Sequence, residues 1–104
     1  MPKKEKAAKD AVSDDRLLPG ENPATEHQDD AFHWAQVYRE LCEFKERAID
    51  RIGIESVSLG DAARQEIEAT DLVVLRAERD RLRRRGEFWR DRYRELVRKE
   101  VKPA

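Results

Sequence analysis

The sequence predicts an all-α protein, an antiparallel helical hairpin with coiled-coil-like packing and a disordered N-terminal tail. Two segments, residues 30–52 and 59–101, repeat apolar residues at steps of three and four, which places them on one face of a helix. Charged residues make up 43% of the chain, a fraction that suits exposed helices better than a globular core. We therefore expect a disordered charged tail at residues 1–28 and a helical hairpin domain at residues 29–102.

The longer segment, residues 59–101, organises the rest of the chain. No proline interrupts it, and it is rich in arginine, glutamate, leucine and alanine, which favour helices. Two apolar seams run along it, and the second keeps the heptad spacing that favours left-handed packing against another helix. The first seam comprises Ala63, Ile67, Thr70, Val74 and Ala77, and the second comprises Leu72, Leu75, Leu82, Trp89, Tyr93 and Leu96.

Gly86 lies on the second seam, directly after three arginines. This pattern is typical of a helix end, because cations suit the last turn and glycine suits a left-handed cap. No proline or polar turn cluster follows, however, and a glycine on a seam lets a neighbouring helix approach closely. We expect one continuous helix, whereas a break at Gly86 would give a monomeric three-helix bundle.

The shorter predicted helix spans residues 30–52. Asp29 and Asp30 open it as capping residues, and Gly53 follows as a natural cap. The short connection at residues 54–58 favours an antiparallel hairpin. The main apolar seam of this helix comprises Trp34, Val37, Leu41, Phe44 and Ala48.

The N-terminal residues 1–28 carry many charges and few large apolar side chains, which favours disorder. Leu17 and Leu18 are the exception, since they precede a Pro-Gly turn. This pair is either a weakly apolar piece of tail or a short element that docks on the helices.

The stretch from residue 76 to residue 98 holds ten arginines against five acids. Arginines near aromatic rings can bind phosphates and stack on bases, so a nucleic-acid surface is one interpretation. Acids at helical spacing from these arginines favour a solvated, ion-paired face, and the partner could also be an acidic protein or the chain's own acidic tail. The possible phosphate contacts are Arg76, Arg79, Arg83, Arg90 and Arg94.

No pattern of a catalytic, metal or cofactor site is visible, and we expect neither an enzyme nor a cofactor. His27 and His33 are six residues apart, which does not place them on one helix face. The single cysteine, Cys42, has acidic neighbours that raise a thiol pKa, so we do not expect a nucleophile. We also expect no small-molecule substrate, because two helices enclose little concave surface.

The predicted lengths indicate that a partner covers the aromatic end of the long helix. At ~1.5 Å per residue the two helices measure about 35 Å and about 65 Å, so the first would reach only the neighbourhood of Leu82. The aromatic residues beyond that point would form an apolar patch. The expected partner is a second copy of the chain or another helical protein. The expected contact residues are Leu82, Phe88, Trp89, Tyr93, Leu96 and Val97, with Trp34 at the junction.

These observations favour a small cytoplasmic coiled-coil module for protein–protein interaction, acting as an adaptor, regulator or assembly subunit. Its contact surface would be the aromatic C-terminal part of the long helix. A nucleic-acid-associated regulator that uses residues 76–98 is the alternative. A cytoplasmic location is expected because one cysteine cannot form an internal disulfide and because no apolar stretch is long enough to span a membrane.

Overall fold

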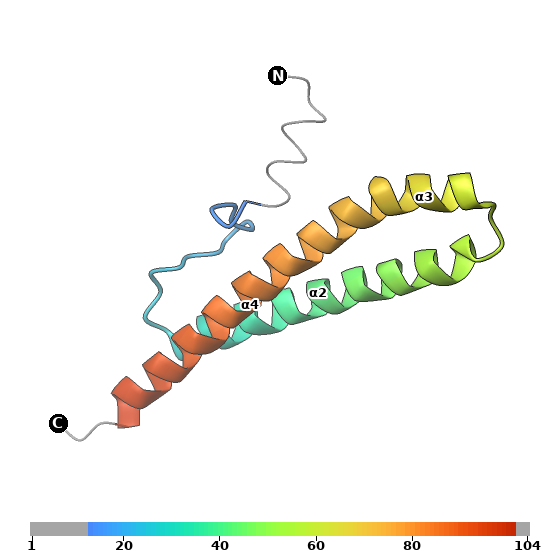
Figure 1. The fold of residues 1–104 in the computed structure, drawn as a ribbon. Coiled ribbons are helices and arrows are strands. Elements are labelled where there is room, and N and C mark those ends of the chain that lie inside the picture. Colours follow the sequence, from blue (N-terminus) through green and yellow to red (C-terminus); the bar gives the residue numbers. More distant parts are fainter. Residues whose placement is uncertain (1–12, 102–104) are drawn as a thin grey trace.

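The computed structural model describes residues 13–101 and confirms an all-helical hairpin. Helix α2 spans Gln28–Ser56, α3 spans Asp61–Ala69 and α4 spans Asp71–Val101. Helices α2 and α4 lie side by side and run in opposite directions (Figure 1). The described residues measure 65 × 33 × 15 Å, so they form a single layer of helices with a segment of irregular chain along it. Within residues 13–101, no helix is both long and apolar enough to cross a membrane.

Helix α2 is longer than the sequence predicted at both ends. It begins at Gln28, where Thr25 donates its hydroxyl to Asp30 over 2.7 Å and accepts the backbone N–H of His27. Asp29 and Asp30 therefore lie in the first turn rather than at the cap, where their charge still suits the helix dipole.

Gly53 does not end α2, which corrects our expectation of a cap at this position. The helix continues for three further residues, because hydroxyl groups bind carbonyls of the last turns. Ser56 donates to the carbonyl of Gly53 over 3.0 Å, and Ser58 donates to the carbonyl of Glu55 over 3.1 Å.

The expected single helix at residues 59–101 is bent at Thr70. Its hydroxyl donates to the carbonyl of Glu66 over 2.8 Å, and its backbone leaves the helical region at φ −120° and ψ −78°. A threonine that binds the carbonyl four residues back commonly bends a helix. The bend separates the short α3 from α4.

Gly86 lies inside α4, which continues through it as predicted. A side chain added at Gly86 would place its Cβ 3.5 Å from the Cβ of Tyr38 on α2. The missing side chain thus lets the two helices approach closely at the second seam, as the sequence suggested.

The core of the hairpin lies at the aromatic end of α4. Trp89 and Tyr38 are fully buried, and they are the largest such side chains. Half-buried apolar residues from α2, α4 and the N-terminal segment pack around this cluster. The cluster comprises Ala31, Tyr38, Leu82, Trp89 and Leu96, with Leu18, Trp34, Ala35, Leu41, Cys42 and Tyr93 packed against it.

The register of the hairpin differs from the one that our length argument assumed. The N-terminal turn of α2 lies beside the last turns of α4, where Gln28 donates to Glu100 and Phe32 lies 5.6 Å from Tyr93 between ring centroids. The argument was wrong because α2 is longer than predicted and begins beside the last turns of α4 (Figure 1). The part of the chain left without cover is α3, which has no buried residue.

Residues 13–27 form no helix or strand, but they are held against the helices rather than free. A tight turn spans residues 18–21, and it is closed by a 3.0 Å hydrogen bond from the Glu21 N–H to the Leu18 carbonyl. Gly20 has φ +86°, the conformation that the third position of a type II turn requires. The expected disordered tail, 1–28, therefore differs from the structure over residues 13–27, while residues 1–12 lie outside the described residues.

Candidate interaction surfaces

The hairpin itself covers most of the aromatic residues that we expected to contact a partner. Leu82, Trp89 and Leu96 are buried. Trp34, Tyr93 and Val97 are half-buried, and only Phe88 is exposed, at 37%. The structure thus brings five of these residues, Leu82, Trp89, Leu96, Trp34 and Tyr93, into or beside the hairpin core, whereas the sequence predicted an open aromatic surface.

The carboxylate of Glu21 is the polar centre of this buried region. One oxygen accepts the Tyr38 hydroxyl at 2.5 Å and the Leu18 backbone N–H at 2.9 Å. The other oxygen accepts the Arg85 guanidinium at 2.6 Å and the Trp89 indole N–H at 2.7 Å. The Glu21 side chain is 0% exposed, so this one carboxylate joins α2, α4 and the N-terminal segment.

The charges of Glu21 and Arg85 stabilise each other. Burial by itself raises the pKa of the Glu21 carboxyl, but four hydrogen bonds, led by that from Tyr38, outweigh it and the net pKa lies below its ordinary value. Burial lowers the pKa of Arg85, yet its hydrogen bond with Glu21 contributes to a net rise. Burial and the bond to Glu21 both raise the pKa of Tyr38. The site therefore holds an ionised carboxylate, an arginine cation and a neutral phenol.

Two further contacts fasten the N-terminal segment to the same side of α4. Asp14 pairs with the guanidinium of Arg84 over 3.0 Å. The backbone carbonyl of Thr25 accepts two hydrogen bonds from Arg92, at 2.8 and 3.2 Å. Arg84, Arg85 and Arg92 thus form a cationic track along α4, and the segment lies on it.

The arginines that we predicted as phosphate contacts lie elsewhere on α4, and several of them pair with acids. Arg79 contacts Asp80 at 3.0 Å, and Arg83 contacts Glu46 at 3.2 Å. Arg94 contacts Asp91 at 3.6 Å, whereas Arg76 and Arg90 are exposed. A phosphate at these positions would compete with carboxylates already in place.

Cys42 faces the interface between α2 and α4, where its thiol lies 3.8 Å from the carbonyl of Arg79. Burial raises the pKa of this thiol, and the nearby carboxylate of Glu46 raises it further. A thiol with a raised pKa is a poor nucleophile at neutral pH. No group of three metal-ligating side chains lies close together among residues 13–101.

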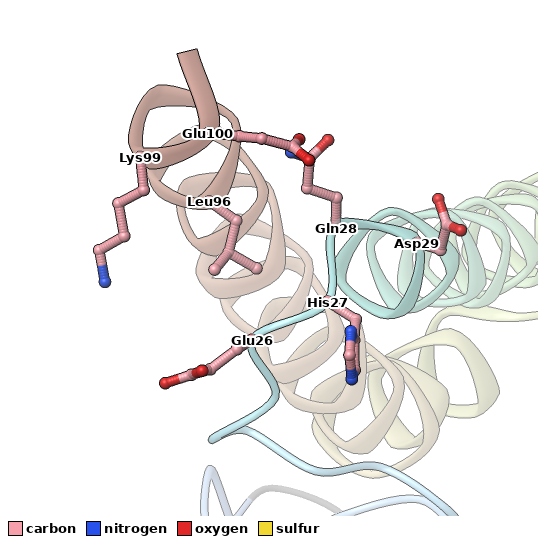
Figure 2. Close-up of a pocket in the computed structure, with 7 residues that line it drawn as sticks. All are labelled: Glu26, His27, Gln28, Asp29, Leu96, Lys99 and Glu100. Carbon is pink, nitrogen blue, oxygen red and sulfur yellow. The ribbon is translucent and has the colours of Figure 1, made fainter. Parts of the chain in front are cut away.

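A shallow hollow of about 510 Å³ lies where the start of α2 meets the end of α4. Figure 2 shows the Gln28 side chain reaching the carboxylate of Glu100, whereas the side chain of Lys99 extends in another direction. The rim mixes charges of both signs on exposed side chains, which does not select one class of ligand. Its lining residues are Glu26, His27, Gln28, Asp29, Leu96, Lys99 and Glu100.

The opposite end of the hairpin, near the bend at Thr70, exposes apolar side chains. Ile54 is 75% exposed and Val57 is 72% exposed. Both line a groove of about 540 Å³ between the end of α2 and the start of α4, which we call the hinge groove. It is lined by Ile49, Asp50, Gly53, Ile54, Val57, Leu72 and Arg76.

A second groove of about 590 Å³ lies at the same end of the hairpin. It includes Val73 and Val74, which are 53% and 45% exposed. The consecutive apolar run at residues 72–75 on α4 is therefore only partly covered, since Leu72 alone among its members is buried.

Comparisons with family models, curated proteins and solved structures find no match to this chain. The candidate surfaces therefore rest on the geometry of the chain itself.

Sequence reasoning missed both the Glu21 site and the hinge groove. The Pro-Gly turn was visible, but Glu21 stood among many tail acids with no pattern that marked it as buried. The hinge groove was missed because Gly53 indicated a helix end, although Ile54 and Val57 are both apolar residues of the predicted connection. Their spacing around a predicted turn was the one available signal.

Proposed function

We propose that the chain is a helical protein–protein interaction module that pairs with a second copy of itself through the hinge groove. The observation that carries this proposal is the exposure of Ile54 and Val57 beside two charges of opposite sign, Asp50 and Arg76, in one groove. A cytoplasmic location belongs to the same proposal, because the single cysteine forms no internal disulfide.

The exposed apolar side chains argue for a covered state. Single surface isoleucines are ordinary, but several at one end of a small protein indicate an interaction site. The adjoining helix α3 is only nine residues long and has no buried residue. A helix of that length is marginal in water without packing, so contacts from a partner would stabilise it.

The charges argue that the partner is another copy. Asp50 and Arg76 form no ion pair within the part of the chain that the structure describes. In a two-fold arrangement the same patch meets itself, so Asp50 of one copy would face Arg76 of the other, and the reverse. One groove would thus provide the apolar centre and both halves of two ion pairs.

The aromatic end of α4 is not the self-association surface in this proposal. The hairpin and the N-terminal segment cover Trp89 and Leu96, so those side chains are not available to a second copy. Interaction as the general function is retained from the sequence, and the surface is reassigned to the hinge groove.

Light scattering across a concentration series tests the proposal. We expect the full chain to rise from its monomer mass of 12.2 kDa towards twice that value at high micromolar concentration. Ile54→Glu should keep the chain monomeric, because a charge would then be buried at the centre of the interface. Phe44→Glu is the matched control, since Phe44 is 60% exposed on the same helix and lies outside both grooves.

A charge exchange tests the predicted pairing of Asp50 with Arg76. Asp50→Arg or Arg76→Asp alone should weaken association, since each places like charges opposite one another. The double variant should restore it. A wild-type chain that stays monomeric, or single variants that associate like the wild type, would refute self-association through this groove.

Nucleic-acid binding remains the less supported alternative. It would use Arg76, Arg79, Arg83, Arg90 and Arg94, of which three already contact acids. Salt-dependent binding of a duplex or single strand would be its signature, because each neutralised phosphate releases counterions.

A further inference from the structure

We propose that the cationic track of α4, together with Tyr38 and Trp89, is a binding site for a turn-forming acidic peptide of another protein, and that residues 13–27 are a tethered, displaceable occupant. The ligand class is a peptide with an apolar residue three positions before a glutamate. The proposal is independent of self-association, since the track lies at the other end of the hairpin from the hinge groove.

The helices provide the parts that recognise the glutamate. Three of its four hydrogen-bond donors are side chains of α2 and α4, namely Tyr38, Arg85 and Trp89. The Arg85 guanidinium also lies 4.6 Å from the centre of the Phe88 ring, which helps to hold it in place. The carboxylate therefore enters a receptor built by the helical hairpin, and an arginine with two aligned neutral donors is selective for a carboxylate.

The contacts that residues 13–27 make with the helices define the features that a partner peptide would need. Leu18 packs against the core cluster three positions before Glu21. The Thr25 carbonyl on Arg92 is a backbone contact, and it makes no demand on the side chain at that position. The contact between Asp14 and Arg84 adds a second acidic position seven residues before the glutamate.

The internal structure of the segment is local. Its two turns are closed by hydrogen bonds from Glu21 to Leu18 and from Thr25 to Asn22, each within four residues. The Asn22 side chain accepts the N–H of Ala24, a further contact within the turn. The Thr25 hydroxyl also donates to Asp30 in the first turn of α2, which anchors the end of the segment to the helix that follows it. A free peptide with the same turn residues can form both turns, so the contacts of Leu18 and Glu21 do not require the peptide to belong to the same chain.

The tether gives the chain's own segment an advantage over a free peptide. The segment continues directly into α2, which keeps it near the track at an effective concentration of at least about millimolar. A partner peptide therefore binds well only when it exceeds that competition or when the tethered segment is weakened. Displacement would uncover the indole of Trp89 and the half-buried aromatic residues around it.

The test uses the full chain carrying Glu21→Ala as host and a synthetic peptide of residues 13–27 as probe. The matched control is the same peptide with glutamine in place of glutamate at position 21. The readout is the indole N–H resonance of Trp89 in the NMR spectrum, because that proton is donated to the Glu21 carboxylate. Should this host lose its helical circular dichroism, Glu21→Gln replaces it, since the amide keeps the shape of the side chain.

We expect the wild-type peptide to return the Trp89 resonance to its position in the wild-type chain. The glutamine peptide should bind at least tenfold more weakly, and the wild-type chain should resist the wild-type peptide at least tenfold more than the host does. A peptide that fails to bind a folded host at millimolar concentration overturns the proposal and makes residues 13–27 a fixed part of the fold. Equal binding of the two peptides overturns it as well.

Discussion

The indole N–H of Trp89 donates to the carboxylate of Glu21 over 2.7 Å, although the two residues are 68 positions apart in the sequence. The same carboxylate oxygen accepts from Arg85, and the other oxygen accepts from Tyr38. A single acidic side chain thus connects an irregular segment to both helices of the hairpin. The stability of the aromatic end should depend on it.

Glu21→Ala should destabilise the chain by about 3 kcal/mol, because it leaves the buried Arg85 cation and three neutral donors without their acceptor. The measurement is the free energy of unfolding from urea titration followed by circular dichroism. Glu26→Ala is the control, since Glu26 is exposed in the same segment and should change stability by less than about 0.5 kcal/mol. A loss below about 1 kcal/mol for Glu21→Ala would show that the carboxylate contributes little.

Acid should reveal the same contact. The pKa of folded Glu21 lies below its ordinary value of 4.5, so the unfolded chain binds more protons in the interval between the two values. The stability that Glu21 contributes is therefore complete above about pH 4.5 and is lost as the pH falls through the folded pKa. The difference in unfolding free energy between wild type and Glu21→Gln should shrink below that pH. A difference that stays constant down to pH 3 would contradict this linkage.

High pH should also weaken the site, in this case through ionisation of Tyr38. Burial and the Glu21 carboxylate raise the pKa of this phenol above 10.0, so its contribution is complete below pH 10.0 and is lost as the pH rises through the folded value. Ultraviolet titration of the two tyrosines should show one phenol that ionises late. In Tyr38→Phe this late transition should be absent, and a wild-type chain that lacks it would count against the buried contact.

The helical hairpin could be predicted because apolar spacing assigns helix faces directly. The same spacing contains no information on how far one helix slides along the other, since a heptad pattern pairs equally well when shifted by seven residues. Our length argument placed the uncovered end at Trp89, whereas the pairing of Gln28 with Glu100 places it at α3. Axial register depended on the turn at residues 57–60, whose path the sequence does not specify.

The two candidate surfaces differ in how far the sequence indicated them. The Pro-Gly turn predicted the local shape around Gly20, but the burial of Glu21 depends on donors from Tyr38, Arg85 and Trp89, which meet only after the hairpin has formed. The bend at Thr70 likewise depends on one hydroxyl that donates to a backbone carbonyl. A threonine within a helical pattern does not by itself predict such a bend. The sequence predicted local structure, but it did not predict contacts between residues far apart in the chain.

Gly20→Ala should destabilise the chain by about 1–2 kcal/mol, the usual cost of a left-handed conformation for a residue with a side chain. Gly20 has φ +86° in the turn that presents Glu21. The expected result is a lower urea midpoint together with a changed Trp89 indole resonance, because the turn positions the carboxylate. A variant with unchanged stability and an unchanged resonance would show that the turn tolerates another conformation.

Gly86→Ala should stabilise the chain, unlike Gly20→Ala, although Gly86 lies where the two helices approach closely. An added Cβ would lie 3.5 Å from the Cβ of Tyr38, an ordinary van der Waals contact, and α4 is regular at this position. In the interior of a helix alanine is more favourable than glycine by about 0.5–1 kcal/mol, so the variant should unfold at a higher urea concentration.

Gly86→Leu is the matched control for that gain, because its larger side chain would force α2 away from α4 and should destabilise the hairpin by about 1–3 kcal/mol. If Gly86→Ala also lowers stability, there is less space between Gly86 and Tyr38 than the 3.5 Å distance to an added Cβ indicates. If both variants are neutral, the two helices separate freely at this point, and the burial of Tyr38 and Trp89 would not depend on their close approach at Gly86.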